Sequence, residues 1–341
     1  MPRNENIHNR VESSPTAPCL SVVIATYNRC DVLKETLRRL DRQTLAHDRF
    51  EVIVVDDGSP DATAATVNAI AKSVSFPLRY LHHENRGPGY TENIGIKAAK
   101  HELLLLIADD IWSHPNLLTE HIDYHLKYPQ SKFGVLGSVS QSSDLSKTVL
   151  HNYWDPFQFD RFEHGQEVDG VYFHACNISV KRDFLINNGL FLERKGAAHE
   201  DIELGYRLAC KGLRLIYNKN ASAVHHHAET LDGICARAFE RGRNFDLLLN
   251  SLPPAFALPL YKIFSPEAGF RQLFRMFPRE LMRLSLFNSF SVRYFWRPTL
   301  AAAENGGLAR LAASQLAYRG IAGHYLRAGF REMKKQRKLT T

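Results

Sequence analysis

Two adjacent aspartates, Asp109 and Asp110, come shortly after an apolar run that begins at Leu103 and ends at Ile107. Neighbouring carboxylates repel each other and resist removal from water, so a buried pair needs a cation or strong donors to neutralise it. A hard divalent ion carrying a diphosphate would meet that need. A polar strand end that turns into a loop is the simpler alternative for an isolated pair.

Further groups that could do chemistry lie downstream. Glu200 and Asp201 precede apolar residues at helical spacing, where negative charge at a helix start also has a purely structural explanation. His225, His226 and His227 are consecutive, so on a strand they point to alternate faces and cannot all meet one ion. A solvated loop histidine is the alternative for each of them.

The elements that must position these groups alternate short β-branched runs with helical patterns, which is typical of a parallel sheet with helices on its faces. Strands are expected over 20–26, 51–57, 78–82 and 103–107, and helices over 31–40, 61–71 and 91–100. The carboxyl ends of such strands share one edge of the sheet, where ligands of open α/β sheets bind. The fold class expected is therefore α/β, with a mostly parallel central sheet and flanking helices.

Composition limits the class of protein. The 341 residues are 44% apolar and 23% charged, enough for one large domain plus an appendage. The first 18 residues are polar, unlike an export signal, and no apolar stretch reaches the ~18 residues of a membrane span. The five cysteines include no Cys-x-x-Cys pair, which argues against a disulfide framework or a zinc knuckle. We therefore expect a cytoplasmic protein.

Positive charge is concentrated in the last third of the chain. Residues 235–341 hold 18 Lys and Arg against 6 Asp and Glu, within a whole-chain balance of +7. Between Phe270 and Phe287, arginines recur at every fourth position beside an apolar stripe, a pattern suited to an anionic membrane surface. Packing of that stripe on the catalytic domain, with the arginines solvated, is the alternative.

Several motifs together resemble one known family. They are Ser21-Val-Val-Ile-Ala-Thr-Tyr-Asn-Arg, Val54-Val-Asp-Asp-Gly-Ser-Pro-Asp, Asn85-Arg-Gly-Pro-Gly-Tyr-Thr-Glu-Asn-Ile-Gly, Ala108-Asp-Asp and His199-Glu-Asp-Ile-Glu-Leu-Gly-Tyr-Arg-Leu. In this order they look like a family 2 glycosyltransferase of the GT-A fold. The resemblance covers roughly residues 18–245 and implies a Rossmann-like GT-A domain at 18–249. Composition and pattern predict a disordered tail at 1–17 and a basic α-helical region at 250–341.

The resemblance also implies the donor-nucleotide site. Tyr27 would stack on the base and Asp57 would accept its ring N–H, although Asp57 capping a turn is the alternative. The residues implied for this site are Ala25, Tyr27, Arg29, Asp57, Arg86 and Asp109.

In the family, a Mg²⁺ or Mn²⁺ bridges an Asp-x-Asp motif and the diphosphate. The resemblance gives the metal to Asp110, with His226 as a further ligand and His225 as second choice, and gives Asp109 to the metal or the donor ribose and sugar. Two positions depart from the family. Ile107 replaces the usual first Asp, and Glu92 stands where Arg is common, a loss for which Arg86 is expected to compensate.

Asp201 matches the carboxylate that removes the proton from the acceptor hydroxyl, and Glu200 would bind the acceptor. Because the Gln-x-x-Arg-Trp motif of processive synthases is absent, we expect an enzyme that moves a single sugar. The resemblance implies that the transfer is inverting, from a nucleotide-diphosphate donor, a UDP-sugar, to a glycan or lipid-linked acceptor. The anionic inner membrane face is a further expected partner, and nucleic acid is not. A sugar nucleotidyltransferase and an inactive nucleotide-sugar-binding scaffold are the alternatives.

Overall fold

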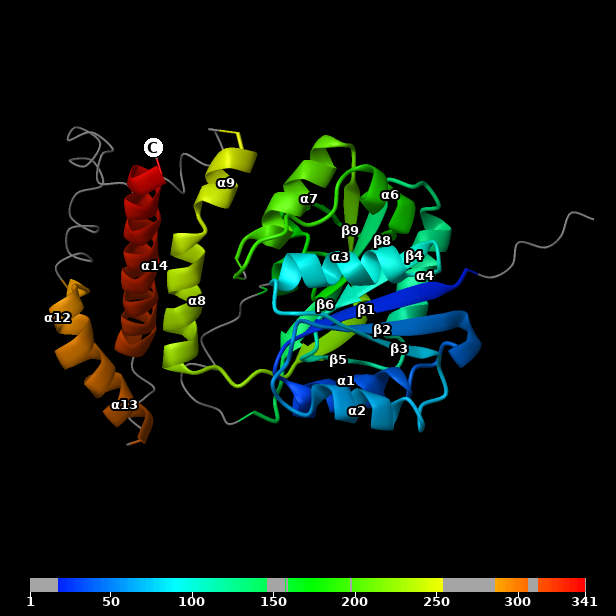
Figure 1. Ribbon diagram of the computed structural model, residues 1–341, viewed down its shortest axis with the longest axis horizontal. Coiled ribbons are helices and arrows are strands. Elements are labelled where there is room, and N and C mark those ends of the chain that lie inside the picture. The colour runs from blue at the N-terminus through cyan, green and yellow to red at the C-terminus, as the bar shows by residue number, and fades with distance from the viewer. Residues whose placement is uncertain are drawn as a thin grey trace, which may run out of the picture.

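The computed structural model describes residues 18–145, 157, 159–196, 198–253, 286–305 and 312–340 (Figure 1). The tail expected to be disordered at 1–17 and the arginine stripe between Arg271 and Arg283 lie outside these residues.

The centre of the protein is a nine-stranded sheet in the order β3-β2-β1-β4-β8-β6-β9-β5, with β7 paired to β9. Strands β1 to β4 are parallel, β8 runs against both of its neighbours, and β9 is parallel to β6. The strands are β1 Leu20–Thr26, β2 Phe50–Asp56, β3 Leu78–His82, β4 Leu103–Ile107, β5 Ile111–Ser113, β6 Phe133–Gln141, β7 Glu167–Val168, β8 Asn177–Lys181 and β9 Arg214–His225. The expected α/β class is confirmed.

Strands β1, β2 and β4 are buried almost throughout, as continuous apolar runs in a sheet covered on both faces must be. Leu20 pairs with Phe50 on one side and with Leu103 on the other, so the three strands start in step. Because the three strands are parallel, their carboxyl ends and the segments after Thr26, Asp56 and Ile107 lie at one edge, with β4 ending two residues earlier than the others. This edge carries the candidate site.

Helices cover both faces of the sheet (Figure 1). Helices α1 and α2 lie on one face, and α3, α6 and α7 lie on the other. The helices of this part are α1 Cys30–Leu40, α2 Thr63–Ile70, α3 Pro88–Ala98, α4 Leu117–Lys127, α6 Arg182–Asn187 and α7 Glu200–Cys210. Short 3₁₀ turns occur at His47–Arg49, Phe159–Arg161 and Gly170–Tyr172.

The C-terminal helices form a separate layer beside the sheet domain (Figure 1). They are α8 Leu231–Arg243, α9 Asp246–Ser251, α12 Ser289–Ser291, a π-helical turn at Val292–Trp296, α13 Arg297–Asn305 and α14 Ala312–Thr340. Although α8 lies within 18–249, it packs on α14 through apolar contacts that include Ile234, Cys235 and Ile321. Among the described residues, every helix falls short of the length or apolar character of a membrane span.

Candidate active site

The aspartate pair is held by Thr26, the last residue of β1, and by Arg29, which follows the strand. Arg29 Nη1 lies 3.0 Å from Asp109 Oδ1 and 2.6 Å from Asp110 Oδ2. Thr26 Oγ1 donates a 2.8 Å hydrogen bond to Asp109 Oδ2. Both carboxylates are 5% exposed, so the pair is buried and held by donors, as its chemistry requires.

The pKa values of the two aspartates are shifted in opposite directions. Burial and the neighbouring Asp110 raise the pKa of Asp109 to about 6. Burial would also raise the pKa of Asp110, but the hydrogen bond and charge of His225, followed by the charge of Arg29, hold it at about 2. Both carboxylates are therefore mostly ionised at neutral pH, and Asp110 stays ionised and able to bind a cation to a lower pH than Asp109 does.

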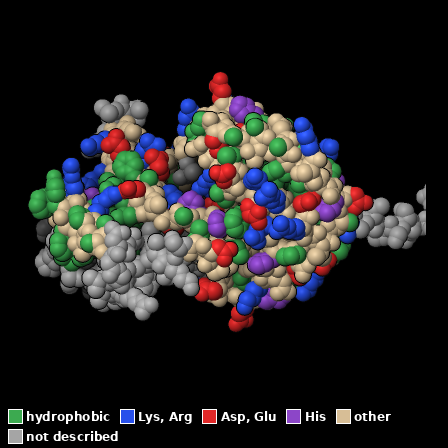
Figure 2. Space-filling model, turned by 90° about the horizontal axis from the view of Figure 1, so that it is seen from below, with side chains coloured by type: hydrophobic (Ala, Val, Ile, Leu, Met, Phe, Trp, Pro, Cys, Tyr) green, Lys and Arg blue, Asp and Glu red, His purple; other side chains and the backbone are tan. Residues whose placement is uncertain are grey.

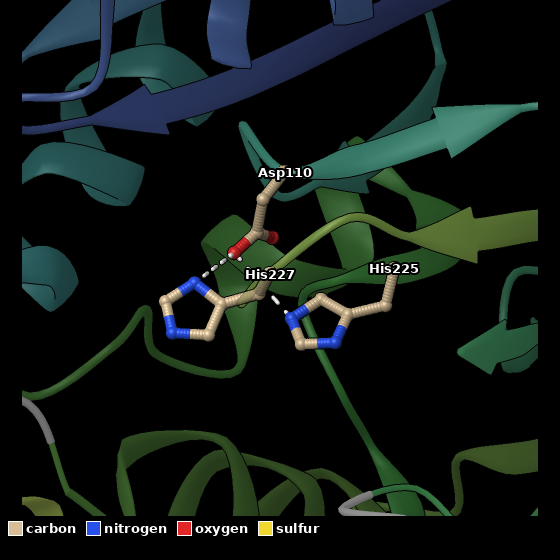
Figure 3. Close-up of side chains that lie close together, drawn as sticks. All are labelled: Asp110, His225 and His227. Carbon is tan, nitrogen blue, oxygen red and sulfur yellow. Dashed lines mark ion pairs between the residues drawn. The ribbon is translucent and has the colours of Figure 1, made fainter. Parts of the chain in front are cut away.

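Two histidines from the end of β9 approach Asp110 (Figure 3). His225 Nε2 lies 3.4 Å from Asp110 Oδ2 and His227 Nδ1 lies 3.5 Å from the same oxygen. One ligand atom from each of the three residues falls within 4.8 Å of the others, as in a metal site. A carboxylate with two imidazoles suits a divalent transition metal better than Mg²⁺, which prefers oxygen ligands alone.

His226, the first choice from the sequence, points elsewhere. Its ring stacks on Trp112 with centroids 3.6 Å apart, and its Nδ1 lies 3.2 Å from Ser142 Oγ. Side chains alternate along a strand, so His225 and His227 share the face toward Asp110 and His226 takes the other. The structure thus brings the second choice, His225, to Asp110, together with His227, which the sequence reasoning did not assign.

Tyr27 and Asp57, which are expected to bind the donor nucleotide, lie at the same edge of the sheet but differ in exposure. Tyr27 is 47% exposed at the end of β1, so its ring is free to stack. Asp57 is buried and accepts hydrogen bonds from Asn85 Nδ2 at 3.1 Å and from the backbone N–H of Arg86 at 2.7 Å. It also accepts from Gly87 N at 3.0 Å, so its oxygens already hold the loop before α3.

The other two residues expected at the donor site, Arg86 and Ala25, make contacts within the protein. The Arg86 guanidinium lies 3.8 Å above the Tyr90 ring, which is a cation–π contact rather than an open phosphate contact. Ala25 lies within β1, opposite Val55 of β2. Gly87 has φ +96°, and a Cβ there would lie 2.2 Å from the Arg194 carbonyl oxygen, so its glycine is needed for close backbone packing.

The expected base, Asp201, lies in the first turn of α7, beside the 175–176 segment that Ala108 N also contacts through the Cys176 carbonyl oxygen. Its Oδ2 accepts a 3.3 Å hydrogen bond from Ala175 N and lies 3.9 Å from His174 Nδ1. Burial, followed by the charge of Glu200, raises the pKa of Asp201 to about 8. After burial, the charges of Asp201 and Asp110 both raise the pKa of the Cys176 thiol, so these two carboxylates converge around one residue.

A cavity of about 490 Å³ opens beside the Asp110 cluster, and the C-terminal helices form its far wall. The sheet domain contributes Arg29, Asp110, Phe157, His225 and His227, while α8 and α14 contribute Ile234, Arg237, Ala238, Arg241, Arg319, Ala322, Gly323 and Leu326. The sequence analysis did not assign these helices to the site, because nothing in a single sequence shows where a distant helix docks.

The cavity wall on α8 is cationic. Arg237 pairs with Glu229 and its Nη1 lies 3.5 Å from His227 Nε2, next to the candidate metal site. Burial, followed by the charge of Arg237, lowers the pKa of Arg241. These guanidinium groups and Arg29 can hold the negative charge of a diphosphate.

Comparisons with known proteins find glycosyltransferases. Residues 21–188 match the model of glycosyl transferase family 2. The validoxylamine A glucosyltransferase of Streptomyces hygroscopicus subsp. jinggangensis is 29% identical over 61% of the chain and 55% of its own length. The putative glycosyltransferase EpsH of Bacillus subtilis is 35% identical over 43% of the chain and 41% of its own length. The chain spans about half the length of the curated relatives it matches.

Solved structures show the same fold at low sequence identity. A mannosyltransferase from Pyrobaculum calidifontis, in complex with GDP-Man and Mn²⁺, aligns with a TM-score of 0.58 over 92% of this chain and 88% of its own, at 19% identity. TarS residues 1–349 of S. aureus, in complex with UDP-GlcNAc, align with a TM-score of 0.55 over 93% and 92%, at 16% identity. The chain therefore belongs to glycosyl transferase family 2 and has the GT-A fold expected from its motifs.

Proposed function

We propose that this protein transfers a single sugar, with inversion, from a nucleotide-diphosphate donor to a hydroxyl group of a glycan or lipid-linked acceptor. The observation that carries the proposal is that Asp201 and the end of β4, which bears the Asp109–Asp110 pair held by Arg29, contact the same 175–176 segment, through Ala175 N and the Cys176 carbonyl oxygen. Relatives named as glucosyl- and N-acetylglucosaminyltransferases, and a neighbour solved with UDP-GlcNAc, support a UDP-sugar as donor.

Each end of the cleft has a chemical role in this proposal. Asp201 takes the proton from the acceptor hydroxyl while that oxygen attacks the anomeric carbon, and the bond to the leaving diphosphate breaks in the same step. Arg29 and Arg237 hold the diphosphate. Asp110, His225 and His227 would bind Mn²⁺, which supplies Lewis-acid stabilisation of the leaving group when bound.

A scaffold that only binds nucleotide sugars would gain nothing from Asp201. Partial burial, followed by the charge of Glu200, raises the pKa of Asp201 to about 8, so the charged form is disfavoured in the folded protein. A base poised near neutral pH is what proton abstraction needs. The position is therefore better explained by catalysis than by stability.

The experiment is a panel of UDP- and GDP-sugars, assayed for nucleotide release with a broad acceptor mixture, with and without Mn²⁺. We expect turnover with at least one donor, stimulated by Mn²⁺ and lost in Asp201→Asn. The proposal fails if a folded wild-type protein turns over no donor, or if Asp201→Asn releases nucleotide at the wild-type rate.

We also propose that the basic C-terminal region brings the enzyme to an anionic membrane surface. Phe290, Tyr294 and Phe295 are 73%, 60% and 56% exposed, and Arg293 lies among them. Figure 2 shows hydrophobic side chains gathered at the end of the molecule that α12 and α13 form. Aromatic and basic side chains together favour a membrane interface.

A further inference from the structure

Glu92 of α3 is a buried carboxyl group that the proposed reaction does not yet use. It is 7% exposed, and its Oε2 has no hydrogen-bond partner among the described residues. Buried carboxylates in proteins nearly always have partners, because an unpaired one loses its hydration without compensation. An orphaned oxygen of this kind calls for a ligand or a bound water.

Glu51 shows what a structural buried glutamate looks like in the same domain. It is 3% exposed, and its Oε1 accepts hydrogen bonds from Ser21 Oγ and from Lys100 N, both at 2.8 Å. Its Oε2 lies 3.5 Å from Arg79 Nη1. Glu51 is fully supported by protein donors, whereas Glu92 is not.

The charged residues that act on Glu92 belong to the candidate site. Burial, followed by the charges of Asp201, Glu200 and Asp109, raises the pKa of Glu92 well above the ordinary value. These charges come from the end of β4 and from the start of α7. A protonated carboxyl group can donate one hydrogen bond and accept others.

Glu92 is also held firmly. Asn93, its neighbour in α3, donates from Nδ2 to the Phe191 carbonyl oxygen at 2.9 Å and accepts from Phe191 N at 3.0 Å. A Cβ at Gly89 would lie 2.6 Å from the Leu192 carbonyl oxygen, so the loop after α6 packs tightly on α3. These contacts fix the backbone of α3 at Glu92, so the point from which its buried side chain extends is set.

We infer that Glu92 hydrogen-bonds a hydroxyl group of the sugar being transferred and helps to select that sugar. Asp109 marks the donor end of the cleft and Asp201 the acceptor end, and the group that lies between them in a transfer reaction is the sugar itself. A sugar hydroxyl both donates and accepts, which matches a neutral carboxyl group. This inference rests on the proposed function and adds a specificity residue to it.

The test compares three variants. Glu92→Met keeps the size of the side chain and removes its hydrogen bonds, Glu92→Gln keeps a donor and an acceptor, and Glu51→Gln is the matched buried control. The probes are UDP-glucose, UDP-GlcNAc and GDP-mannose, with UDP and GDP as sugar-free references, all with Mn²⁺ by calorimetry. The melting temperature of each variant is measured alongside.

We expect Glu92→Met to bind the preferred nucleotide sugar about 10- to 100-fold more weakly, and the matching nucleoside diphosphate within about twofold of wild type. Glu92→Gln should fall between the two. Glu92→Met should also melt about 2–4 °C higher, because it removes a buried unpartnered group. Glu51→Gln should melt lower and leave the ratio of the two affinities unchanged.

The inference is overturned if Glu92→Met weakens sugar and sugar-free ligands equally, or if it lowers the melting temperature without changing either affinity. Deoxy-sugar donors give the complementary result. One deoxy position should cost the wild type about tenfold in affinity and cost Glu92→Met little. If wild type binds UDP or GDP but no nucleotide sugar, the proposed function fails together with the inference, which is a different outcome from equal weakening.

Discussion

At the scale of single residues, Asp201 controls the pH dependence of the reaction. A general base works only when deprotonated, and the pKa of Asp201 is about 8 in the free enzyme. We expect kcat/KM to fall about tenfold per unit below pH 8 and to level off above it. Asp201→Asn should lower kcat by about 10²- to 10⁴-fold. A pH–rate profile of kcat/KM measures the first expectation, and a flat profile from pH 6 to 9 would contradict it.

The same carboxyl should make the folded protein less stable at high pH. Its pKa is raised on folding, so its contribution to stability is most favourable below about 3.9, the unfolded value, and declines as pH rises toward about 8. Asp201→Asn removes this dependence. Urea unfolding at pH 9 should therefore show the variant to be more stable than wild type, and equal stabilities at pH 9 would argue against the burial of a charged Asp201.

The histidines offer a test with an internal control. His225→Ala and His227→Ala each remove a group facing Asp110, so we expect each to weaken Mn²⁺ binding at least tenfold. His226→Ala removes a ring that stacks on Trp112, and should change Mn²⁺ binding little. Free Mn²⁺ measured by electron paramagnetic resonance reports all three. A larger loss in His226→Ala would favour the assignment made from the sequence.

The residues that could be predicted from sequence are those whose role follows from local spacing. Asp109, Asp110 and Asp201 follow or begin regular elements, and the end of β4 and the start of α7 both contact the 175–176 segment. The position of His227 could have been predicted, because alternation along a strand places it on the same face as His225. The positions of Arg237 and Arg241 could not, because they depend on how α8 docks beside the sheet, and a single sequence carries no signal for that docking.

At the scale of elements, the strands were predicted closely because buried parallel strands are continuous apolar runs. Expected and observed bounds agree for 20–26, 78–82 and 103–107, while α3 begins at Pro88, three residues before the expected start. Proline at the first turn of a helix has no N–H to lose, and that signal was available. The antiparallel insertion of β8 between β4 and β6 depends on long-range pairing that no local pattern encodes.

The contact between α8 and α14 depends on two glycines and gives a prediction at this scale. A Cβ at Gly242 would lie 2.0 Å from the Leu326 carbonyl oxygen, and one at Gly329 would lie 2.0 Å from the Phe239 carbonyl oxygen. Gly242→Ala or Gly329→Ala must therefore push the helices apart, at a cost of about 1–3 kcal/mol. Urea unfolding measures the loss.

Gly323 of α14 is the matched control for these two positions. A Cβ there would meet only the end of the Arg327 side chain, at 3.3 Å, so Gly323→Ala should leave stability unchanged or raise it by about 0.5–1 kcal/mol. Because Arg237 and Arg241 lie on α8, Gly242→Ala should also raise KM for the donor. A stable Gly242→Ala protein with wild-type KM would show that the helix contact does not position the cavity wall.

At the scale of the whole molecule, the net charge of +7 arises in the last third of the chain, where residues 235–341 carry 18 basic and 6 acidic side chains. Basic side chains near an anionic bilayer contribute about 1 kcal/mol each, and exposed aromatic rings add an apolar contribution. We expect the protein to sediment with phosphatidylserine liposomes and not with neutral ones, and binding should weaken as salt rises.

The aromatic cluster separates this membrane contact from simple charge attraction. Replacing Phe290, Tyr294 and Phe295 together by serine should lower the liposome-bound fraction of the protein severalfold. Nucleotide release from the donor, assayed with soluble acceptors, should be unchanged. Leu126→Ser, which alters a 58% exposed apolar side chain on α4, is the control and should bind as wild type does. Equal liposome binding by wild type and the triple variant would show that these aromatic side chains do not contact the membrane. If deletion of residues 250–341 also left binding unchanged, the C-terminal region would have no role in membrane attachment, and the acceptor would have to reach the cleft by another route.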